Sequence, residues 1–522
     1  MATTDKLNLD QAKISQARSL AKNIADSIQG YINRNTTTTI ERTTLRLFGV
    51  KGVDEDQTPL VNVIVDSLGD KLGGGISTPF LSAAAKTGKS AIELAEAICS
   101  GQIDMNDYAA SDAESIYKVG QEFLAPQLDR IKQMRKIREE KISAETKKER
   151  PLLYVIVATG NIHEDVLQAR RAAIEGADII AVIRATAQSL LDYVPYGLTT
   201  EGFGGTYATQ ENFELMRAAL DEVGDELGRY VRLVNYASGL CMPEIAAMGA
   251  MERLDMMLND SMYGILFRDI NMYRTFCDQH FSRMINAYAG ITINTGEDNY
   301  LTTADAIEAA DTVLASDLIN EQFALNSGLS PKMMGLGHAY EIQPEIENSF
   351  LLELSQALLL REVFPEHPLK YMPPTKHMTG DIFRTYMVNA MFNMVGQWTG
   401  QGIQLLGMLT EALHTPFLQD RYLAIKNAEI VMSAVKDIGN EVFFKDNGIV
   451  KTRAKDVLDK TVSLLEEVSE TGLMESIANG RFAEIKRAKD GGKGLVGVAP
   501  KTDDYYNPVL DVFKKELDAV ID

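Results

Sequence analysis

Two side chains that could bind an anion lie just after a short apolar run in the middle of the chain. Arg184 follows the run Ile179–Ile183, and Ser189 lies in the polar loop beyond it. A guanidinium fork, a hydroxyl and loop amides together suit a phosphate group. Arg184 alone fits a structural ion pair equally well. We therefore treat Arg184 and Ser189 as candidate phosphate ligands.

Other chemically capable side chains occupy similar positions farther along the chain. Asp298 and Lys370 could bind the amine and carboxylate of an amino acid or set a cofactor's protonation, but plain surface charges fit equally well. Tyr263 could cover an aromatic ligand by stacking, although a core tyrosine is the commoner case. His338 and His377 could transfer protons, although a structural histidine is commoner. The other polar residues near such positions are Asn235, Ser238 and Asp260.

The apolar runs before these residues have the composition of buried strands. Leu152–Gly197 reads as a strand, a helix over His163–Ile174, a second strand and a polar loop. Two neighbouring strands joined by a helix are most simply parallel. The unit recurs along the chain and gives eight candidate strands: Leu152–Ala158, Ile179–Ile183, Tyr230–Tyr236, Leu254–Leu258, Gly290–Ile293, Lys332–Leu336, Lys370–Met372 and Gln404–Met408.

Eight parallel strands that alternate with helices predict an α/β fold, the TIM (β/α)8 barrel, whose sites lie at the C-terminal strand ends. The alternative is a doubly wound open sheet, but Thr159–His163 lacks the Gly-rich turn of its dinucleotide-binding form. We expect a helical extension at residues 1–150, the barrel at 151–416, and a C-terminal helical extension with a docking tail at 417–522. From spacing alone, the barrel is predicted to bind a phosphorylated aromatic cofactor and a small zwitterion.

The overall composition limits the classes of partner. The net charge of −21 disfavours non-specific binding to nucleic acid or to an anionic membrane. The three cysteines are far apart and match no metal-ligand spacing, which indicates a reducing compartment. Residues 1–16 lack the apolar core of a signal peptide, and no apolar run is long enough to span a bilayer. We expect a cytoplasmic protein without a metal site of its own.

Seven segments spread over nearly the whole chain are similar to one known family. On these segments the chain resembles the large α subunits of lysine 5,6-aminomutase, which act with pyridoxal 5′-phosphate (pyridoxal phosphate) and adenosylcobalamin. Long matches of this kind are more specific than any single motif. The matching segments are Thr36–Arg46, Ala185–Gly197, Glu201–Thr206, Asn235–Leu240, Asn294–Asp298, Pro373–Gly380 and Tyr505–Pro508.

The resemblance implies a TIM barrel that carries pyridoxal phosphate at its mouth. It implies a radical reaction that moves the terminal amino group of D-lysine or L-β-lysine to the neighbouring carbon. The matched positions are Arg184 and Ser189 at the phosphate, Ser238 with Asn235 beside the pyridine ring, Tyr263 stacked on that ring, and Asp298 and Lys370 near cofactor and substrate.

The resemblance also implies a partner. A cobalamin site carries Asp-x-His-x-x-Gly, but the nearest match here, Asp278-Gln279-His280, has Arg283 in place of the glycine and a helical setting. In the family, the cobalt-binding histidine and the lysine that binds pyridoxal phosphate come from a smaller β subunit. Lys370 is therefore not assigned that role, and an α2β2 heterotetramer is expected. Two alternatives stay open: a self-sufficient pyridoxal phosphate barrel such as a racemase, and a non-catalytic binding scaffold.

Overall fold

The structure is a computed structural model that describes residues 6–108, 110–183, 187–237, 239–295, 309–340, 343 and 345–521. Arg184, Ser238 and Asp298 therefore lie outside the described residues. Every other candidate site residue is described.

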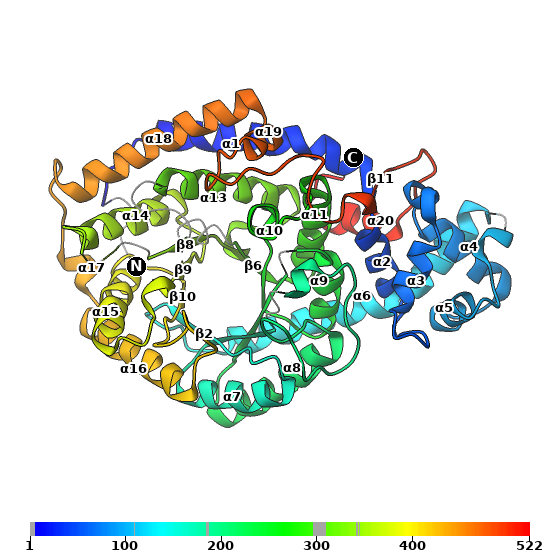
Figure 1. Ribbon diagram of the computed structural model, residues 1–522, viewed down its shortest axis with the longest axis horizontal. Coiled ribbons are helices and arrows are strands. Elements are labelled where there is room, and N and C mark those ends of the chain that lie inside the picture. Colours follow the sequence, from blue (N-terminus) through cyan, green and yellow to red (C-terminus); the bar gives the residue numbers. More distant parts are fainter. Residues whose placement is uncertain are drawn as a thin grey trace.

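A ring of short parallel strands forms the centre of the molecule (Figure 1). The strand order is β7-β6-β5-β4-β3-β2-β10-β9-β8. Only Leu336 separates β7 from β8, so the two ends of the sheet are two parts of one chain segment and the ring closes. The strands are β2 (Leu152–Ile156), β3 (Ile179–Ile183), β4 (Arg232–Tyr236), β5 (Met256–Leu258), β6 (Thr292–Asn294), β7 (Met334–Gly335), β8 (Gly337–Ala339), β9 (Lys370–Met372) and β10 (Ile403–Leu405).

The predicted TIM barrel is confirmed, and each of the eight predicted runs overlaps a strand. Successive side chains along each strand point alternately into the barrel and toward the outer helices, and both sets are largely apolar because both surfaces of the sheet are buried. Tyr154, Ile179 and Val234 face the barrel interior in one apolar cluster. Their neighbours Leu153 and Leu233 belong to the core between the strands and the helices.

An outer ring of helices covers the strands. Gly176 ends the first of these helices with a positive φ of 123°, as expected for a glycine after a helix. The last helix of the ring, α16, packs against both α7 and α15, so the ring continues beyond residue 416. The domain boundaries expected at residues 150 and 416 stay predictions. The helices are α7 (Ile162–Glu175), α8 (Gln210–Leu227), α9 (Met242–Met251), α10 (Ser261–Arg268), α11 (Met272–Ala289), α13 (Ala310–Asn326), α14 (Ser349–Val363), α15 (Ile382–Trp398) and α16 (Leu418–Ala434).

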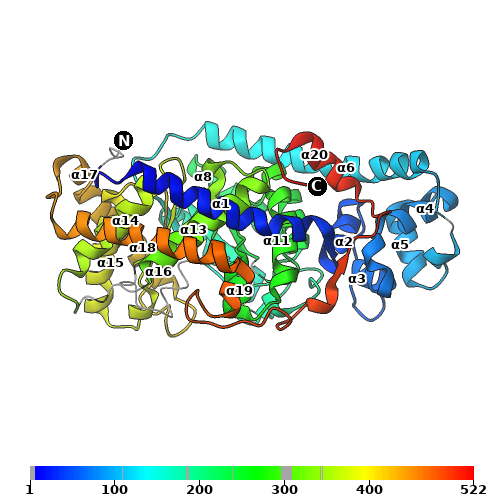
Figure 2. The same cartoon turned by 90° about the horizontal axis from the view of Figure 1, so that it is seen from above.

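The two chain ends meet on one side of the barrel. Strand β1 (Asn35–Thr37) pairs antiparallel with β11 (Val498–Pro500), and α1 packs along α18, as Figure 2 shows. Among the described helices, none is long and apolar enough to cross a membrane. The N-terminal helices are α1 (Gln11–Arg34), α2 (Thr38–Leu47), α3 (Leu60–Asp66), α4 (Ser77–Thr87), α5 (Ala91–Cys99) and α6 (Ala113–Ser143); the C-terminal helices are α17 (Ile438–Glu441), α18 (Ile449–Thr471), α19 (Leu473–Ala478) and α20 (Pro508–Glu516).

Candidate active site

The amine of Lys370 lies in the barrel interior. This lysine is the first residue of β9 and only 1% exposed. Its Nζ lies 6.0 Å from the ring centroid of Tyr236, the last residue of β4, and the Tyr154 hydroxyl donates to the Tyr236 hydroxyl at 3.1 Å. A cation this close to an aromatic face is attracted by the ring quadrupole. The side chain thus reaches toward the C-terminal strand ends, although Lys370 itself begins its strand.

Ser189 lies in a short 3-10 helix, η3 (Ala187–Leu190), which is fastened to neighbouring loops. Its carbonyl accepts from Leu240 N at 2.9 Å. A Cβ on Gly239 would lie 2.6 Å from the Cβ of Ser189, so only glycine permits this approach. The side-chain amide of Gln188 donates to the Ala208 carbonyl at 2.9 Å and accepts from the Ala208 N–H at 2.6 Å. The loops after β3 and β4 therefore form one packed unit.

Tyr263 lies on α10, which follows β5 and contacts η3. The Tyr263 side chain is half-buried. The Arg268 guanidinium carbon lies 5.1 Å from its ring centroid, and the Phe267 ring lies 5.7 Å away. Asp260 caps the start of α10 by accepting from Met262 N. Ser189 and Tyr263 are thus carried by adjoining elements at the same end of the barrel.

Two buried amides lie near the strand ends, on opposite faces of the sheet. Asn235 is fully buried, and alternation with the interior-facing Val234 places it on the helix side of β4. A Cβ added to Gly335 would meet both the Asn294 Oδ1 and the side chain of Ile403. Because Ile403 belongs to the apolar cluster inside the barrel, Asn294 also faces the interior. Within the described residues, no amide atom of either asparagine has a hydrogen-bond partner. Buried amides are normally satisfied, so these groups are candidates for ligand contacts.

His338 and His377, which could transfer protons but are more commonly structural, lie in buried or half-buried settings. His338 is buried, stacks on Tyr371 at 4.5 Å and bonds Gln401 through Nε2 at 2.9 Å. Burial lowers the pKa of His338 to about 4. His377 lies in η6 (Thr375–His377), where burial, helped by the nearby Arg384, also lowers its pKa to about 4. His338 therefore has a structural role between the strands and the helices.

The N-terminal helix α2 is joined to the loop after η3 by charged residues, of which Arg42, Glu244 and Arg274 are buried and Asp192 is partly exposed. Arg42 bonds Asp192 at 2.5 Å and Glu244 at 2.7 Å, and Arg274 bonds Asp192 at 2.9 Å. Although burial opposes its charge, the guanidiniums of Arg42 and Arg46 lower the pKa of Glu244. Truncating one member of such a network leaves an unpaired buried charge. Through Asp192, the network links α2 and α11 to the segment that carries Ser189.

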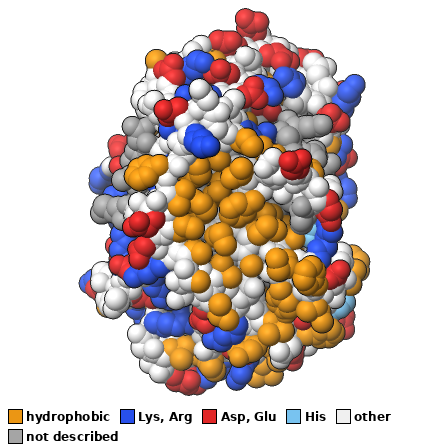
Figure 3. Space-filling model, turned by 90° about the vertical axis from the view of Figure 1, so that its left-hand side faces the viewer, with side chains coloured by type: hydrophobic (Ala, Val, Ile, Leu, Met, Phe, Trp, Pro, Cys, Tyr) orange, Lys and Arg blue, Asp and Glu red, His pale blue; other side chains and the backbone are white. Residues whose placement is uncertain are grey.

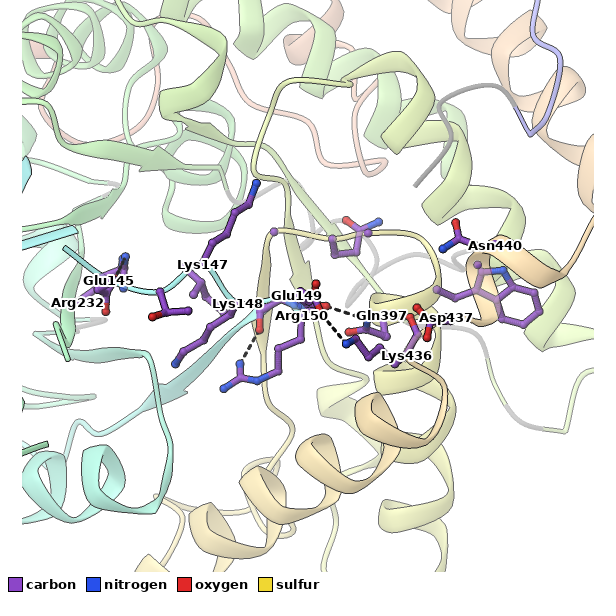
Figure 4. A pocket seen from close by; sticks show the side chains of 18 of the residues that line it. Glu145, Lys147, Lys148, Glu149, Arg150, Arg232, Gln397, Lys436, Asp437 and Asn440 are labelled. Atoms are coloured by element: carbon purple, nitrogen blue, oxygen red, sulfur yellow. Dashed lines mark hydrogen bonds and ion pairs between the residues drawn. The ribbon is translucent and has the colours of Figure 1, made fainter. Parts of the chain in front are cut away.

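A large cavity of about 840 Å³ lies at the other end of the barrel. Its lining includes Leu152, Arg232 and Gly402, which are at or next to the starts of β2, β4 and β10. Figure 4 shows charged side chains around it that are largely paired, such as Lys436 with Glu149. TIM-barrel active sites lie at the C-terminal end of the strands. We therefore separate this cavity from the candidate site.

Comparison with known proteins identifies the family. The family model described as the D-lysine 5,6-aminomutase TIM-barrel domain of the alpha subunit matches residues 7–512. The chain belongs to this family. It is 55% identical to the lysine 5,6-aminomutase alpha subunit of Acetoanaerobium sticklandii, over 98% of this chain and 99% of the relative. It is also 55% identical to the alpha subunit of Fusobacterium nucleatum, over 97% and 98% of the two chains.

A more distant relative is the D-ornithine 4,5-aminomutase subunit beta of Acetoanaerobium sticklandii. It is 27% identical over 70% of this chain and 50% of its own length. Membership in the lysine 5,6-aminomutase alpha-subunit family makes this chain an aminomutase subunit, and aminomutases are isomerases. The family favours this function over the racemase and scaffold alternatives.

The near-match to the cobalamin motif in this family member is structural. Asp278 lies inside α11, where it accepts from Thr37 at 2.5 Å and from Arg274 at 2.8 Å. His280 is buried beside Ser327, with its Nδ1 2.9 Å from the hydroxyl oxygen. The helical setting expected from the sequence is confirmed. Among the described residues, no group of His, Cys, Asp and Glu could hold a metal ion.

Sequence reasoning missed three residues that the barrel brings to the interior. Tyr154 and Tyr236 share a hydrogen bond beside Lys370, and Asn294 faces the same space. The period-2 alternation of β2 and β4 could have indicated the tyrosines. Asn294 begins the segment Asn294–Asp298, which the family resemblance includes, but its buried and unpartnered amide is visible only in the structure.

Proposed function

We propose that this chain is the pyridoxal phosphate- and substrate-binding subunit of an aminomutase that moves the terminal amino group of D-lysine or L-β-lysine to the adjacent carbon. The observation that carries the proposal is the convergence, at one end of a closed barrel, of the η3 segment, the Gly239 loop, α10 and the interior Lys370. Sites at this end are the rule for TIM barrels.

The described residues fit a phosphorylated aromatic cofactor at the barrel mouth. Ser189 is held by its neighbours in a packed loop unit, and we assign it, with Arg184, to the cofactor phosphate. Tyr263, on the adjoining helix, would cover one face of the pyridine ring. We assign Ser238, with Asn235, to the edge of the ring; Asn235, on the helix side of β4, would act where that strand leads into the Ser238 loop. The interior-facing amide of Asn294 offers a further polar contact.

Lys370 suits the substrate carboxylate. The attraction between an ammonium group and an anion is stronger in a buried site than in water, and Lys370 is almost fully buried. Asp298 would then bind an amino group of the substrate. A zwitterion held at both ends presents its terminal amine in one orientation, and such positioning can supply much of a catalytic effect.

Both cofactors would supply chemistry that side chains cannot: pyridoxal phosphate an electron sink, and adenosylcobalamin the initiating radical. This chain's part is to bind, orient and shield. A smaller β subunit would bring the cobalt-binding histidine and the lysine that binds pyridoxal phosphate, in an α2β2 assembly. The three free cysteines and the net negative charge fit a cytoplasmic enzyme.

The proposal is tested by locating the lysine that binds pyridoxal phosphate. The chain is purified alone and with the smaller subunit, incubated with pyridoxal phosphate, reduced with borohydride and mapped by peptide mass spectrometry. We expect covalent attachment to the partner only, and turnover of D-lysine or L-β-lysine only by the complex with adenosylcobalamin. Attachment to Lys370 in the isolated chain would support the racemase alternative, and no binding in either sample would support a scaffold.

A further inference from the structure

The two extensions cover only part of the barrel's outer ring. Helix α1 packs on α13, α18 packs on α13 and α14, and α2 and α6 pack on α9 and α11. Helices α15, α16 and α7 lie on the remaining part, with α16 between the other two (Figure 1). Among the described helices of the two extensions, only the short α17 packs on this part of the ring, against α15, so most of it is uncovered.

Large apolar side chains are exposed on this uncovered part. Phe383 on α15 is 79% exposed, and Phe417 before α16 is 64% exposed. Figure 3 shows a broad apolar area on this side of the molecule. We call these residues the α15–α16 face: Ile382, Phe383, Met387, Leu413, Phe417, Leu418, Tyr422 and Ile430. Contiguous apolar surface of this kind marks an interaction site rather than ordinary surface.

The amino-acid pattern of α15 shows that the exposure is built into the helix. Its inner side buries Val388, Phe392 and Val395 against the barrel. Its outer side carries Phe383 and Met387, where a helix facing water would carry polar residues. The helix is therefore apolar on two sides, which is expected when a second protein surface covers the outer one.

The α15–α16 face adjoins the barrel mouth. Ile382 and Phe383 are the first two residues of α15, which follows β9; Phe417 precedes and Leu418 begins α16, which follows β10. The start of a barrel helix lies at the end where the preceding strand finishes. A protein bound to this face would be anchored on the rim of the candidate site.

We infer that the α15–α16 face docks the smaller partner subunit through an apolar surface on that subunit; this rests on the proposed function. The curated relatives are alpha subunits, so the family works with another chain, and that chain must reach the mouth. A second copy of this chain fits less well. Two chains of charge −21 repel each other, and a symmetric contact here would set one barrel against the rim of the other.

The test is the double variant Phe383→Asp, Met387→Asp of the full chain. Both side chains are more than half exposed, so the fold should be kept, which circular dichroism and thermal unfolding check. The matched control is Tyr117→Asp, Val496→Asp, two exposed apolar residues outside the face. We expect the dissociation constant for the purified smaller subunit, measured by calorimetry, to rise at least about tenfold in the first variant and to stay unchanged in the control.

Wild-type affinity in a correctly folded double variant would overturn the inference. So would a loss of self-association, measured by light scattering of the chain alone, with partner affinity unchanged, because the occupant would then be a second copy. Turnover of D-lysine and L-β-lysine by the wild-type complex is measured separately. If the wild-type complex forms but converts neither amino acid, the proposed function is refuted. If the wild-type complex is active and the double variant still binds the smaller subunit with wild-type affinity, only the docking face is refuted.

Discussion

At the scale of residues, Lys370 places an amine inside a barrel whose interior is largely apolar. Its side chain is almost fully buried and lies against Tyr236, beside the hydrogen bond from Tyr154. The surrounding interior consists of residues such as Ile179, Val234 and Leu405. Lysine is rarely this buried, and buried ionisable groups gather at functional sites, which supports the role proposed for Lys370.

The variant Lys370→Met keeps the apolar stem and removes the ammonium group. If Lys370 binds the substrate carboxylate, the KM for D-lysine should rise by about a hundredfold, as for truncated buried charge pairs. Steady-state kinetics of the complex with the smaller subunit measure this, with Lys332→Met, an exposed lysine before β7, as the control. A near-normal KM and kcat in Lys370→Met would remove the residue from the site.

His338 should make stability depend on pH. Its folded pKa of about 4 lies below the ordinary value of 6.5, because burial disfavours the charged ring. The unfolded chain therefore binds a proton that the folded chain does not as pH falls from 6.5 toward 4. The contribution of this group to the free energy of unfolding is complete above pH 6.5 and falls by about 1.4 kcal/mol per pH unit below it.

His338→Gln keeps a polar group near Gln401 but cannot titrate. We expect the variant to be less stable than the wild type at pH 7 but to lose less stability between pH 6.5 and pH 4.5. Urea unfolding at several pH values measures both. Parallel pH curves for the two proteins would mean that His338 is protonated in the folded chain.

At the scale of elements, the loops that follow β3 and β4 act as one unit because Gly239 has no side chain. The substitution Gly239→Ala would place a Cβ 2.6 Å from Ser189, closer than real contacts allow, so η3 must shift. Overpacking of this kind typically costs about 1–3 kcal/mol. Because η3 carries the proposed phosphate ligand, the dissociation constant for pyridoxal phosphate in the complex should rise at least about tenfold.

Absorbance titration measures that affinity, and urea unfolding measures the stability of the same variant. Gly74→Ala is the matched control, because a Cβ there meets only Thr502 Oγ1 at 3.8 Å. An unchanged affinity for pyridoxal phosphate in Gly239→Ala, despite reduced stability, would separate η3 from the cofactor site.

The elements were predictable from the sequence where local patterns decide them. Runs rich in Val and Ile, such as Ile179–Ile183, became strands with the expected bounds. The bounds shifted where the signal was weak: Gln404–Met408 was expected and Ile403–Leu405 is observed. The break at Leu336 and the place of α16 in the ring depend on closure of the barrel, which no local pattern encodes.

The same limit applies to the candidate site. The position of Ser189 could be predicted, because its loop follows a clear strand. Its fastening to Gly239, and the link from Arg42 to Asp192, join residues 50 or 150 positions apart, a separation that spacing and periodicity cannot bridge. The sequence also placed Lys370 at a strand end, whereas it begins β9 and reaches the mouth only through its long side chain.

At the scale of the whole molecule, the N-terminal and C-terminal segments pair with each other along one side of the barrel, and we call this paired arrangement the belt. Gly494 accepts from the Arg274 guanidinium at 3.1 Å, so the segment Gly491–Gly497 lies against the charge network of Arg42, Arg274 and Asp192. Asn507 donates to Thr44 Oγ1 at 2.9 Å. The segment Tyr505–Pro508, which lies in the expected docking tail, therefore docks on this chain's own α2, which in turn supports the loop that carries Ser189.

The contact that closes the belt can be tested at Tyr505. Its hydroxyl donates to the buried carboxylate of Glu41 at 3.0 Å, and that carboxylate also accepts from Thr36 and from Ile76 N. Burial raises the pKa of Glu41, and these donors oppose the rise. Tyr505→Phe keeps the ring that packs against Gly75 but removes one donor, so the free energy of unfolding should fall by about 1–3 kcal/mol. Urea unfolding measures the loss, with the exposed Tyr117→Phe as the control. Because α2 reaches Asp192, affinity for pyridoxal phosphate should fall with it; a loss of stability with unchanged affinity would show that the belt supports the fold but not the site.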